Sequence, residues 1–230
     1  MKKINLHLGE RSYSILIGRN LLSSLGRLIK PIAKGSKVLV VSNRRVAGLF
    51  LKKVLSSLEA AGFKPLRPFL LPFGNERDKS EKVLFKTWEH MAKAGLERSS
   101  FLVALGGGVA GDLAGFAAST YMRGIPLIHV PTTLLAQVDS AIGGKTAIDL
   151  HWAKNMVGSF YQPRLVLSDV SVLTRMGLTS QGLRELRNSF AEIIKYGMIA
   201  DKKLFEILEK KMAWFLSKAF EKTLGNPELY

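Results

Sequence analysis

The feature that most constrains the fold is an uninterrupted apolar run that ends in three glycines. Residues 100–105 read Ser-Phe-Leu-Val-Ala-Leu, and Gly106, Gly107 and Gly108 follow directly. A strand that is apolar at nearly every position is typical of a parallel sheet covered on both faces. Glycines after such a strand allow the chain to turn tightly, and the residues up to Ala118 have a helical pattern. The run therefore predicts a buried strand, a glycine turn and a helix.

Strand and helix patterns alternate before this run. Residues 37–42 are β-branched and apolar, and residues 46–61 repeat apolar side chains at three- and four-residue steps, which is the period of a helix. Gly62 ends that helix, and a strand at residues 66–71 and a helix at residues 80–94 follow. Strands that alternate with helices at this spacing form βαβ units and a parallel sheet. The expected fold class is α/β.

The pattern changes near residue 178. Residues 185–199 and 202–216 both have the helical period, and no further strand pattern follows. We therefore expect an α/β domain over residues 1–177 and the start of an all-helical domain over residues 178–230. Two helices bury too little apolar surface for a core of their own, so we expect either a truncated helical domain or helices that pack against something else.

Composition narrows the classes of partner. No run approaches the roughly 18 apolar residues that cross a bilayer, and the first residues lack the apolar stretch of a signal peptide, so we expect a cytoplasmic protein with no membrane partner. The absence of cysteine leaves His, Asp and Glu as metal ligands. The net charge of +16 raises nucleic acid or a phosphorylated substrate as partners. The basic residues are scattered over helix-like segments, which favours solvated helix faces and no nucleic-acid partner.

Glycines and polar residues gather where the expected strands end. The N–H groups of the glycine turn can approach a pyrophosphate, although a simple tight turn explains the glycines equally well. Asp112, in the first turn of the helix, can orient ligand hydroxyls or complement the helix dipole. Thr132 and Thr133 follow the strand at residues 127–130, where open α/β sheets bind ligands and where a Ser/Thr turn is also common.

The densest polar segment lies at residues 137–146. It contains Asp139 and ends in Gly-Gly-Lys-Thr, and Lys154 and Asn155 follow shortly after. Gly-Lys-Thr suggests a P-loop, but Asp139 stands where that motif needs its first glycine, so a nucleoside triphosphatase is rejected. Clustered cations and polar groups suit a phosphorylated, hydroxyl-rich substrate.

A further polar pair lies on the helix that begins near residue 185. Glu192 and Lys195 are three residues apart and share one face, which by itself predicts a surface ion pair. The four histidines, at positions 7, 90, 129 and 151, show no metal-ligand spacing. A lone histidine of this kind is more often structural.

Taken in order, these segments resemble the 3-dehydroquinate synthases, which are sugar-phosphate cyclases related in fold to the glycerol dehydrogenase group. The matching text spans most of the chain, at residues 106–112, 120–124, 130–140, 143–146, 154–156, 160–163 and 191–197. The resemblance implies a Rossmann-like NAD-binding domain, bound NAD and a divalent metal, zinc or cobalt. The implied reaction converts 3-deoxy-D-arabino-heptulosonate 7-phosphate to 3-dehydroquinate with elimination of phosphate, in the shikimate pathway of aromatic amino acid biosynthesis.

The resemblance also implies a role for each matched position. The residues similar to NAD contacts are Gly74, Glu76, Lys79, Gly106, Gly107, Gly108, Val109, Asp112, Thr132, Thr133, Lys145, Lys154, Leu173 and Thr174. The residues similar to the substrate and catalytic set are Arg123, Asp139, Lys145, Lys154, Asn155 and Lys195. Glu192 is similar to the one metal ligand that this part of the family sequence supplies.

The chain departs from the family pattern at several places. Asn75 is an extra residue in its turn, and the turn at residues 42–45, Ser-Asn-Arg-Arg, lacks the acid often found there, so we expect weaker binding of the adenosine ribose. The turn at residues 174–182 is longer, and Ser189 replaces a glycine. No histidine follows His151, whereas the family places two histidines beside the glutamate on the metal.

These departures leave alternatives open. The chain resembles a 3-dehydroquinate synthase whose metal site is incomplete, and impaired activity is the expectation for such a chain, since metal sites use about three protein ligands. The alternatives are another sugar-phosphate cyclase and a non-catalytic NAD-binding or interaction module of the same fold. The partners implied are a phosphorylated sugar acid, a second copy in a homodimer, and a separate chain that completes the helical domain.

Overall fold

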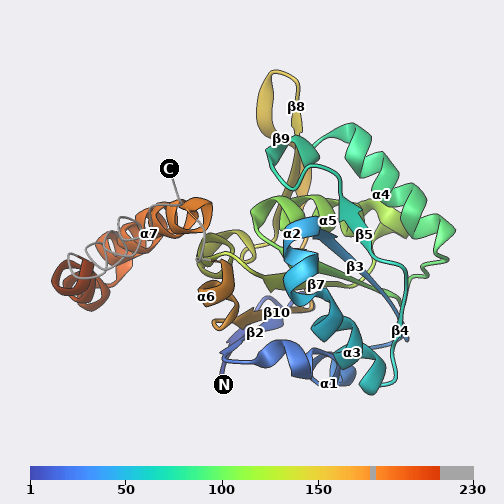
Figure 1. The fold of residues 1–230 in the computed structure, drawn as a ribbon, viewed down its shortest axis with the longest axis horizontal. Helices are drawn as coiled ribbons and strands as arrows, with labels where there is room; N and C mark the ends of the chain where they lie inside the picture. The colour runs from blue at the N-terminus through green and yellow to red at the C-terminus, as the bar shows by residue number, and fades with distance from the viewer. Residues whose placement is uncertain (177–179, 213–230) are drawn as a thin grey trace.

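The computed structural model describes residues 1–176 and 180–212, without the side chains of residues 180, 181 and 183. Its centre is an eight-stranded, mostly parallel sheet in the order β1-β2-β10-β7-β6-β3-β4, with β5 also paired to β3 (Figure 1). The pairing is antiparallel between β1 and β2 alone among these strands. The strands are β1 (Lys2–Leu6), β2 (Tyr13–Gly18), β3 (Lys37–Asn43), β4 (Lys64–Pro65), β5 (Phe69–Leu71), β6 (Phe101–Gly106), β7 (Leu127–Pro131) and β10 (Leu165–Asp169). The expected α/β class with a parallel sheet is confirmed.

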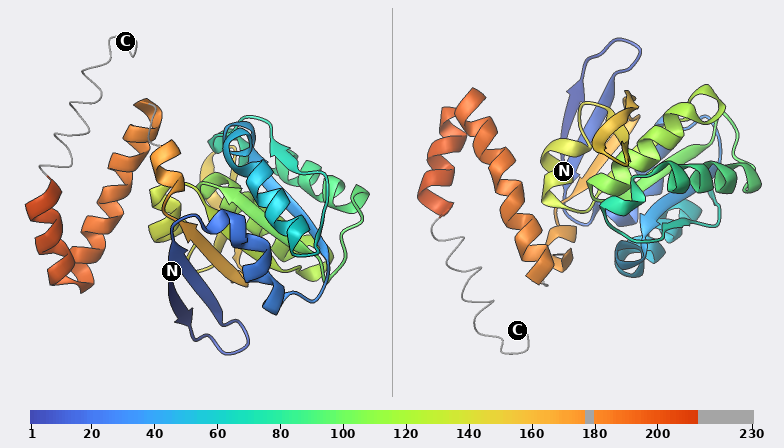
Figure 2. Two further views of the ribbon diagram at one scale, coloured as in Figure 1. Left: turned by 60° about the horizontal axis from the view of Figure 1, so that its bottom comes forward. Right: turned by 90° about the horizontal axis from the view of Figure 1, so that it is seen from above.

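Helices cover both faces of this sheet (Figures 1 and 2). The α-helices of the body are α1 (Leu25–Ile29), α2 (Arg44–Val46), α3 (Lys52–Ala60), α4 (Glu81–Lys93) and α5 (Gly108–Thr120). Short 3-10 turns are η1 (Leu21–Ser24), η2 (Lys30–Ile32), η4 (Glu76–Asp78) and η5 (Tyr121–Arg123), and π-helical turns are η3 (Ala47–Leu51) and η6 (Ala136–Ser140). Every residue of β6 is buried, as an apolar run covered on both faces requires.

The helices that follow β3 and β6 lie on opposite faces of the sheet. Val54 and Leu58 of α3 pack with Val40, whereas Leu113 of α5 packs with Val41, the next residue of the same strand. β3 and β6 are neighbouring strands. The chain leaves their carboxyl ends towards opposite faces of the sheet, so a crevice opens between the two strand ends. Open α/β sheets bind ligands at such a place, outside the carboxyl ends of the strands.

Two parts of the sheet differ from the sequence-based expectation. The β1–β2 hairpin adds strands at one edge that the sequence pattern did not indicate. Of the expected strand at residues 66–71, only residues 69–71 form a strand, β5, and a separate short strand, β4, precedes the expected one; both pair with β3. Pro68 stands between them, and a proline has no N–H to donate to the neighbouring strand. The pairing is therefore interrupted there.

A second, two-stranded sheet projects from the body (Figures 1 and 2). It is an antiparallel hairpin of β8 (Lys145–Leu150) and β9 (Ala153–Phe160) that packs on α5. The approach is close, because a Cβ added at Gly115 of α5 would lie 2.4 Å from Cγ2 of Thr146 in β8. Only a residue without a side chain fits on α5 under this hairpin.

The last described elements are helical, as expected. After α6 (Val172–Met176), α7 (Ser180–Ala200) extends away from the body, and a further helix is described from residue 202 to residue 212. The expected boundary between domains at residues 177 and 178, and the rest of the helical pattern beyond residue 212, lie outside the described residues. No helix in the described part of the chain combines the length and the apolar composition that a membrane crossing needs.

Candidate active site

A cleft of about 600 Å³ opens at the carboxyl ends of the parallel strands. Its walls come from the chain just after β3, β5, β6 and β7, and one side is closed by residues of α6 and α7. This is the crevice at the carboxyl ends of β3 and β6, whose following helices lie on opposite faces of the sheet. The residues that form its walls include Asn43, Arg44, Arg45, Phe73, Gly74, Gly107, Gly108, Val109, Thr132, Thr133, Met176 and Glu185.

The glycine turn presents backbone to this cleft. Gly107 is the N-cap of α5 and supplies no capping side chain. The expectation that Asp112 lies in the first turn is wrong, because α5 begins at Gly108 and its first turn carries no acid. A Cβ at Gly107 would lie 3.1 Å from Cγ2 of Thr133, and one at Gly108 would lie 3.2 Å from Oγ of Ser140. The first N–H groups of a helix have no helical partner and attract anions. The turn thus fits the pyrophosphate of a dinucleotide.

Thr132 adds an independent sign of a ligand. Its side chain is fully buried in the wall of the cleft, and its Oγ1 has no hydrogen-bond partner among the described residues. A buried hydroxyl without a partner is costly, which makes a bound ligand that supplies the partner favourable. The cleft therefore fits the dinucleotide that the family resemblance implies.

A second cleft, of about 480 Å³, adjoins the first. Gly108 belongs to the first cleft and Ser140 to the second, and a Cβ added at Gly108 would lie 3.2 Å from Oγ of Ser140. The walls of the second cleft come from α5, η6 and the β8–β9 hairpin, and they include Asp112, Asp139, Ser140, Lys145, Thr146, Asn155 and Ser159. The turn into the hairpin uses positive φ at Gly143 and Gly144, so Lys145 begins a strand. A P-loop would have a helix there, which agrees with its rejection.

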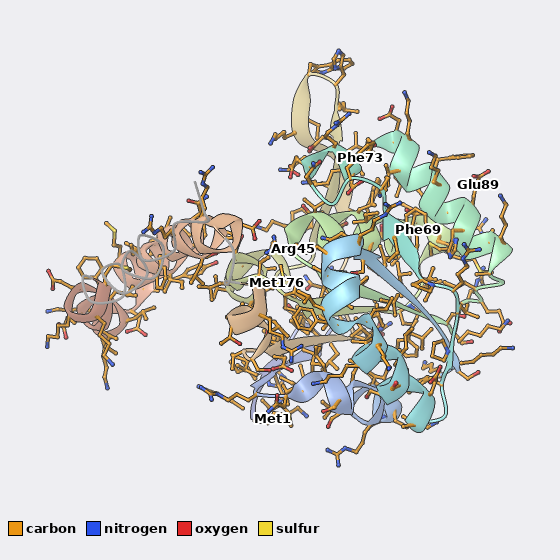
Figure 3. All side chains as sticks on the ribbon, in the orientation of Figure 1. Met1, Arg45, Phe69, Phe73, Glu89 and Met176 are labelled. Carbon is orange, nitrogen blue, oxygen red and sulfur yellow. The ribbon has the colours of Figure 1, made fainter. Side chains whose placement is uncertain are left out.

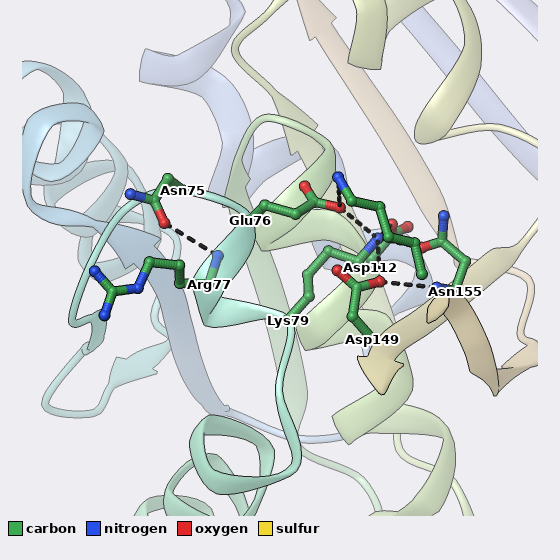
Figure 4. Close-up of polar contacts among 8 residues, drawn as sticks. Asn75, Glu76, Arg77, Lys79, Asp112, Asp149 and Asn155 are labelled. Carbon is green, nitrogen blue, oxygen red and sulfur yellow. Dashed lines mark hydrogen bonds and ion pairs between the residues drawn. The ribbon is translucent and has the colours of Figure 1, made fainter. Parts of the chain in front are cut away.

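Lys79 lies at the centre of a buried charge network beside this second cleft (Figure 4). Its side chain is only 4% exposed, and its Nζ lies 2.9 Å from Oδ2 of Asp112, 3.6 Å from Oε1 of Glu76 and 3.8 Å from Oδ1 of Asp149. Burial opposes the charge of Lys79, but the hydrogen bond and charge of Asp112, with the charges of Glu76 and Asp149, raise its pKa. Lys79 is therefore a charged ammonium.

The network fastens the hairpin to the body. Lys79 donates a hydrogen bond to Oδ1 of Asn155, and the Asn155 N–H donates to Oδ1 of Asp149 at 2.8 Å. Asn155 holds a positive φ of 58° for this arrangement. Lys154 adds an exposed ion pair, with its Nζ 3.7 Å from Oε1 of Glu76. The hairpin residues expected to meet substrate are thus positioned by residues expected to meet the dinucleotide.

The turn that carries Lys79 has its own support. Asp78 is fully buried and accepts hydrogen bonds from the N–H groups of Phe73 and Gly74, at 3.1 and 2.6 Å. The additional residue Asn75 caps the short helix η4, since its Oδ1 accepts from the Arg77 N–H at 3.0 Å. The extra residue is accommodated as a cap, and Glu76 still faces Lys79.

Helix α7 meets the site through Tyr196. Its hydroxyl donates to Oδ1 of Asp139 at 3.1 Å, and Nζ of Lys145 lies 3.8 Å from the same oxygen. Burial and the hydrogen bond to Asp139 raise the pKa of Tyr196. Glu192 and Lys195, on the same helix, form the ion pair expected from their spacing. Neither of these two lies in the wall of either cleft.

The described residues do not by themselves fit a metal. They contain no group of three or more His, Cys, Asp or Glu side chains that could hold one, and Glu192 pairs with Lys195. Structural and catalytic metal sites need about three protein ligands. Glu192 as a metal ligand therefore stays a prediction.

The structure brings most of the expected site residues together, and the four that lie apart are Arg123, Thr174, Glu192 and Lys195. Gly107, Gly108, Val109, Thr132, Thr133 and Gly74 line the first cleft, Leu173 lies beside the two threonines, and Asp112, Asp139, Lys145 and Asn155 line the second. Arg123 lies in η5, at the far end of α5 from the glycine turn. The Thr174 hydroxyl donates to the Ser171 carbonyl, and Lys195 lies on the exposed face of α7. None of these three residues, nor Glu192, lines either cleft.

Sequence reasoning missed two residues of the site. Asp149 joins the Lys79 network, and Tyr196 holds Asp139. Asp149 stands near the tip of a hairpin that the sequence pattern did not indicate. Tyr196 lies within residues 191–197, which match the family sequence. It is four residues from Glu192 and so shares a helix face with it, and this spacing was the only sequence feature that could have identified Tyr196 as a site residue.

Comparison with known proteins finds relatives in one family. Residues 70–183 match the family described as 3-dehydroquinate synthase N-terminal. The 3-dehydroquinate synthase of Pelobacter propionicus is 49% identical over 91% of this chain and 56% of its own length. That of Streptococcus sanguinis is 47% identical over 90% of this chain and 57% of its own length. The chain thus spans a little over half the length of these relatives.

Solved structures show the same fold. The 2-epi-5-epi-valiolone synthase ValA from Streptomyces hygroscopicus subsp. jinggangensis, with NAD+ and Zn2+ bound, covers 93% of this chain and 57% of its own at 28% identity and a TM-score of 0.79. A 2-deoxy-scyllo-inosose synthase complexed with carbaglucose-6-phosphate, NAD+ and Co2+ covers 74% of this chain and 46% of its own at 29% identity and a TM-score of 0.67. In fold and in sequence, the chain belongs to the 3-dehydroquinate synthase family.

Proposed function

We propose that this chain carries the dinucleotide-binding and substrate-binding residues of a 3-dehydroquinate synthase, an NAD- and metal-dependent carbon-oxygen lyase. Its substrate is 3-deoxy-D-arabino-heptulosonate 7-phosphate, and its products are 3-dehydroquinate and phosphate. The observation that supports this proposal is the pair of adjoining clefts, one with a glycine turn and an unpartnered threonine hydroxyl, the other with Lys145, Asn155 and Asp139. A dinucleotide cleft alone would suit many dehydrogenases, whereas the polar second cleft suits a phosphorylated sugar acid.

Bound NAD supplies a hydride acceptor from which the hydride returns to the substrate within one turnover. The residues of this chain bind and orient. The first N–H groups of α5 hold the pyrophosphate, and Thr132 donates its hydroxyl to the dinucleotide. Lys145 and Lys154, two exposed cations on the hairpin, bind the substrate phosphate and carboxylate.

Asp139 and Asn155 orient the substrate hydroxyls in this proposal. Asp139 is held between Tyr196 and Lys145, and Asn155 is held by Lys79 and Asp149. The substrate's own phosphate accepts the proton that is removed beside the oxidised carbon. The protein therefore contributes positioning and charge stabilisation, and neither role requires a protein base. Glu192 contributes one ligand to the metal.

The resemblance also supports a cytoplasmic enzyme that works as a homodimer, or with a second chain that supplies further metal ligands. Light scattering of the purified chain tests the first arrangement, with a mass of two copies as the expected result. The second arrangement predicts that the protein retains zinc only after a second chain carrying histidines is added.

A second candidate function is a dinucleotide-binding module without catalysis. The observation that favours it is the ion pair of Glu192 with Lys195, in a part of the chain where no three-donor metal group is described. This candidate uses the first cleft alone. It predicts dinucleotide binding without phosphate release.

One experiment separates the two candidates. The chain is titrated calorimetrically with NAD+, and phosphate release from the heptulosonate phosphate is then measured with NAD+ and Zn2+ present. Saturable binding with phosphate release supports the synthase, and binding without release supports the module. If neither occurs, both proposals are wrong. Lys145→Met should abolish phosphate release, whereas the control Lys86→Met, an exposed position on α4, should change neither phosphate release nor NAD+ binding.

A further inference from the structure

The glycine turn after β6 has a hydroxyl-bearing residue beside each of two glycines. A Cβ added at Gly107 would lie 3.3 Å from Oγ1 of Thr133, and one added at Gly108 would lie 3.2 Å from Oγ of Ser140. Both hydroxyl-bearing residues come from the chain that follows β7, and β7 pairs with β6. Because a glycine has no side chain, a ligand that rests on the turn comes within reach of both hydroxyls.

The Ser140 hydroxyl is available to a ligand. It makes no hydrogen bond with any residue that the structure describes, although a serine in a helical turn commonly donates to a carbonyl of the preceding turn. Ser140 is half-buried and lines the second cleft. The Thr133 hydroxyl, by contrast, accepts from the Ala136 N–H at 3.2 Å. Of these two hydroxyls, only that of Ser140 has no role in the local fold.

The shape of η6 brings Ser140 to this place. η6 is a π-helical turn, in which the Ala141 N–H donates to the Ala136 carbonyl, five residues back, at 3.1 Å. Such turns are rare and are frequent at functional sites. This turn places two successive residues, Asp139 and Ser140, in the wall of one cleft. Tyr196 holds Asp139, whereas no described residue holds the Ser140 hydroxyl.

The strand order gives the glycine turn two sides, since β6 lies between β3 and β7. On one side, the first cleft extends to the chain after β3 and β5, and there Nη2 of Arg45 donates to the Met176 carbonyl at 3.2 Å (Figure 3). Ser140 lies on the other side, after β7, where the second cleft adjoins. A dinucleotide that reacts with a substrate in the second cleft must place its nicotinamide half on the β7 side. Its adenosine half then lies on the β3 side, because the pyrophosphate joins the two halves across the turn.

We propose that the Ser140 hydroxyl donates a hydrogen bond to the pyrophosphate of bound NAD, at the phosphate group nearer the nicotinamide. The proposal rests on the proposed function, because it places NAD across the same glycine turn, and it adds a residue to that site. The fully buried, unpartnered hydroxyl of Thr132 is the independent observation that points to a ligand in this cleft. The first N–H groups of α5 attract phosphate, and a hydroxyl beside them adds a charge-assisted hydrogen bond. Ser140 therefore fixes the half of the dinucleotide that must reach the substrate.

Calorimetric titration of the full chain with NAD+ tests this inference, together with displacement of NAD+ by AMP and by nicotinamide mononucleotide. Ser140→Ala should weaken NAD+ binding about tenfold, the effect of losing a hydrogen bond to a charged group. Binding of nicotinamide mononucleotide, which carries the nicotinamide-side phosphate alone, should weaken by about the same factor. Binding of AMP, which carries the adenosine-side phosphate alone, should stay within about twofold. The control Ser56→Ala removes a hydroxyl from an exposed position on α3 and should change none of the three affinities.

The outcomes separate this inference from the proposed function. Equal NAD+ binding by the wild type and Ser140→Ala overturns the inference and leaves the proposed function standing. If Ser140→Ala keeps its melting temperature but binds AMP as weakly as nicotinamide mononucleotide, or loses AMP alone, the assignment to one phosphate is wrong. An equal loss of NAD+ binding in Ser56→Ala also overturns it. NAD+ binding that depends on Ser140, without phosphate release, supports the inference and overturns the synthase. A wild-type chain that does not bind NAD+ overturns both.

Discussion

Lys79 connects three parts of the chain at a single buried ammonium. It follows the turn after β5, and its partners Asp112, Asp149 and Asn155 come from α5 and from both strands of the hairpin. With Lys79 charged, the network is compensated. Without it, the carboxylates of Asp112 and Asp149, both of low exposure, would be left with no cation between them.

We predict that Lys79→Met lowers the free energy of unfolding by about 3 kcal/mol, because removal of one partner leaves buried charge uncompensated. Urea denaturation followed by circular dichroism measures the change. Lys86→Met, at an exposed position on α4, should stay within about 0.5 kcal/mol of the wild type. Equal stability of the two variants would show that the network contributes nothing.

His129 makes stability depend on pH. It lies in β7 and is fully buried, and burial lowers its pKa from 6.5 to about 4. The unfolded chain therefore binds a proton between these values that the folded chain does not. Stability should be constant above pH 6.5 and should fall, by up to about 3 kcal/mol, as the pH drops towards 4.

Urea denaturation at several pH values measures this dependence. Substitution His129→Leu should remove this part of the slope between pH 6.5 and 4, whereas His151→Asn, at an exposed turn of the hairpin, should retain it. If the stability of His129→Leu still falls between pH 6.5 and 4 as in the wild type, other groups cause the pH dependence.

At the scale of elements, the β8–β9 hairpin packs closely on α5 because the helix has a glycine at the point of contact. Gly115 lies under Thr146, whose hydroxyl donates to the Ser159 carbonyl at 2.8 Å, and the Ser159 hydroxyl donates to Oγ of Ser119 at 2.8 Å. The hairpin is thus held against α5 by both shape and hydrogen bonds. The position of the second cleft depends on this contact.

We predict that Gly115→Ala displaces the hairpin, because the new Cβ would lie 2.4 Å from Cγ2 of Thr146. Overpacking of this kind costs about 1–3 kcal/mol. Binding of a phosphorylated sugar acid in the second cleft should weaken, and dinucleotide binding in the first cleft should persist, by calorimetry of each. The double variant Gly115→Ala with Thr146→Ser removes the clashing methyl group and should recover substrate binding. Failure of that recovery would place the effect elsewhere.

On the scale of the whole molecule, α7 stands apart from the α/β body (Figures 1 and 2). Met198 and Ile199, near its end, are more than two-thirds exposed. Tyr196 makes a hydrogen bond to the body through Asp139. This hydrogen bond fastens the C-terminal part of the helix to η6.

We predict that Tyr196→Phe loosens α7 without unfolding the body. Loss of one hydrogen bond to a charged group costs about 1.5–3 kcal/mol, and only α7 should be affected. Hydrogen exchange of residues 180–200 should accelerate about tenfold, while exchange of the buried strand β6 stays unchanged. Acceleration in both segments would mean global destabilisation, and no change in either would mean that Tyr196 does not anchor the helix.

The sequence by itself determined the alternating strands and helices from β3 to β7 and the type of site, although it did not indicate the β1–β2 and β8–β9 hairpins. Apolar runs, helical periods and the glycine turn depend on residues within a few positions of one another, so they can be recognised locally. This is why the buried strand β6, the helix after it and the gathering of Thr132, Asp139 and Lys145 could be expected. The fold class also explains why these polar residues gather at the carboxyl ends of parallel strands, where α/β sheets bind ligands.

Only the tertiary structure decided which of these residues meet. Lys79 and Asn155 are 76 positions apart, and Tyr196 and Asp139 are 57 apart, so no local pattern relates them. Their contacts arise because the hairpin docks on α5 and α7 returns to η6, and each docking depends on shape and on the compensation of buried charge. The same reason separates Arg123, at the far end of α5, from a site that its sequence neighbours help to form.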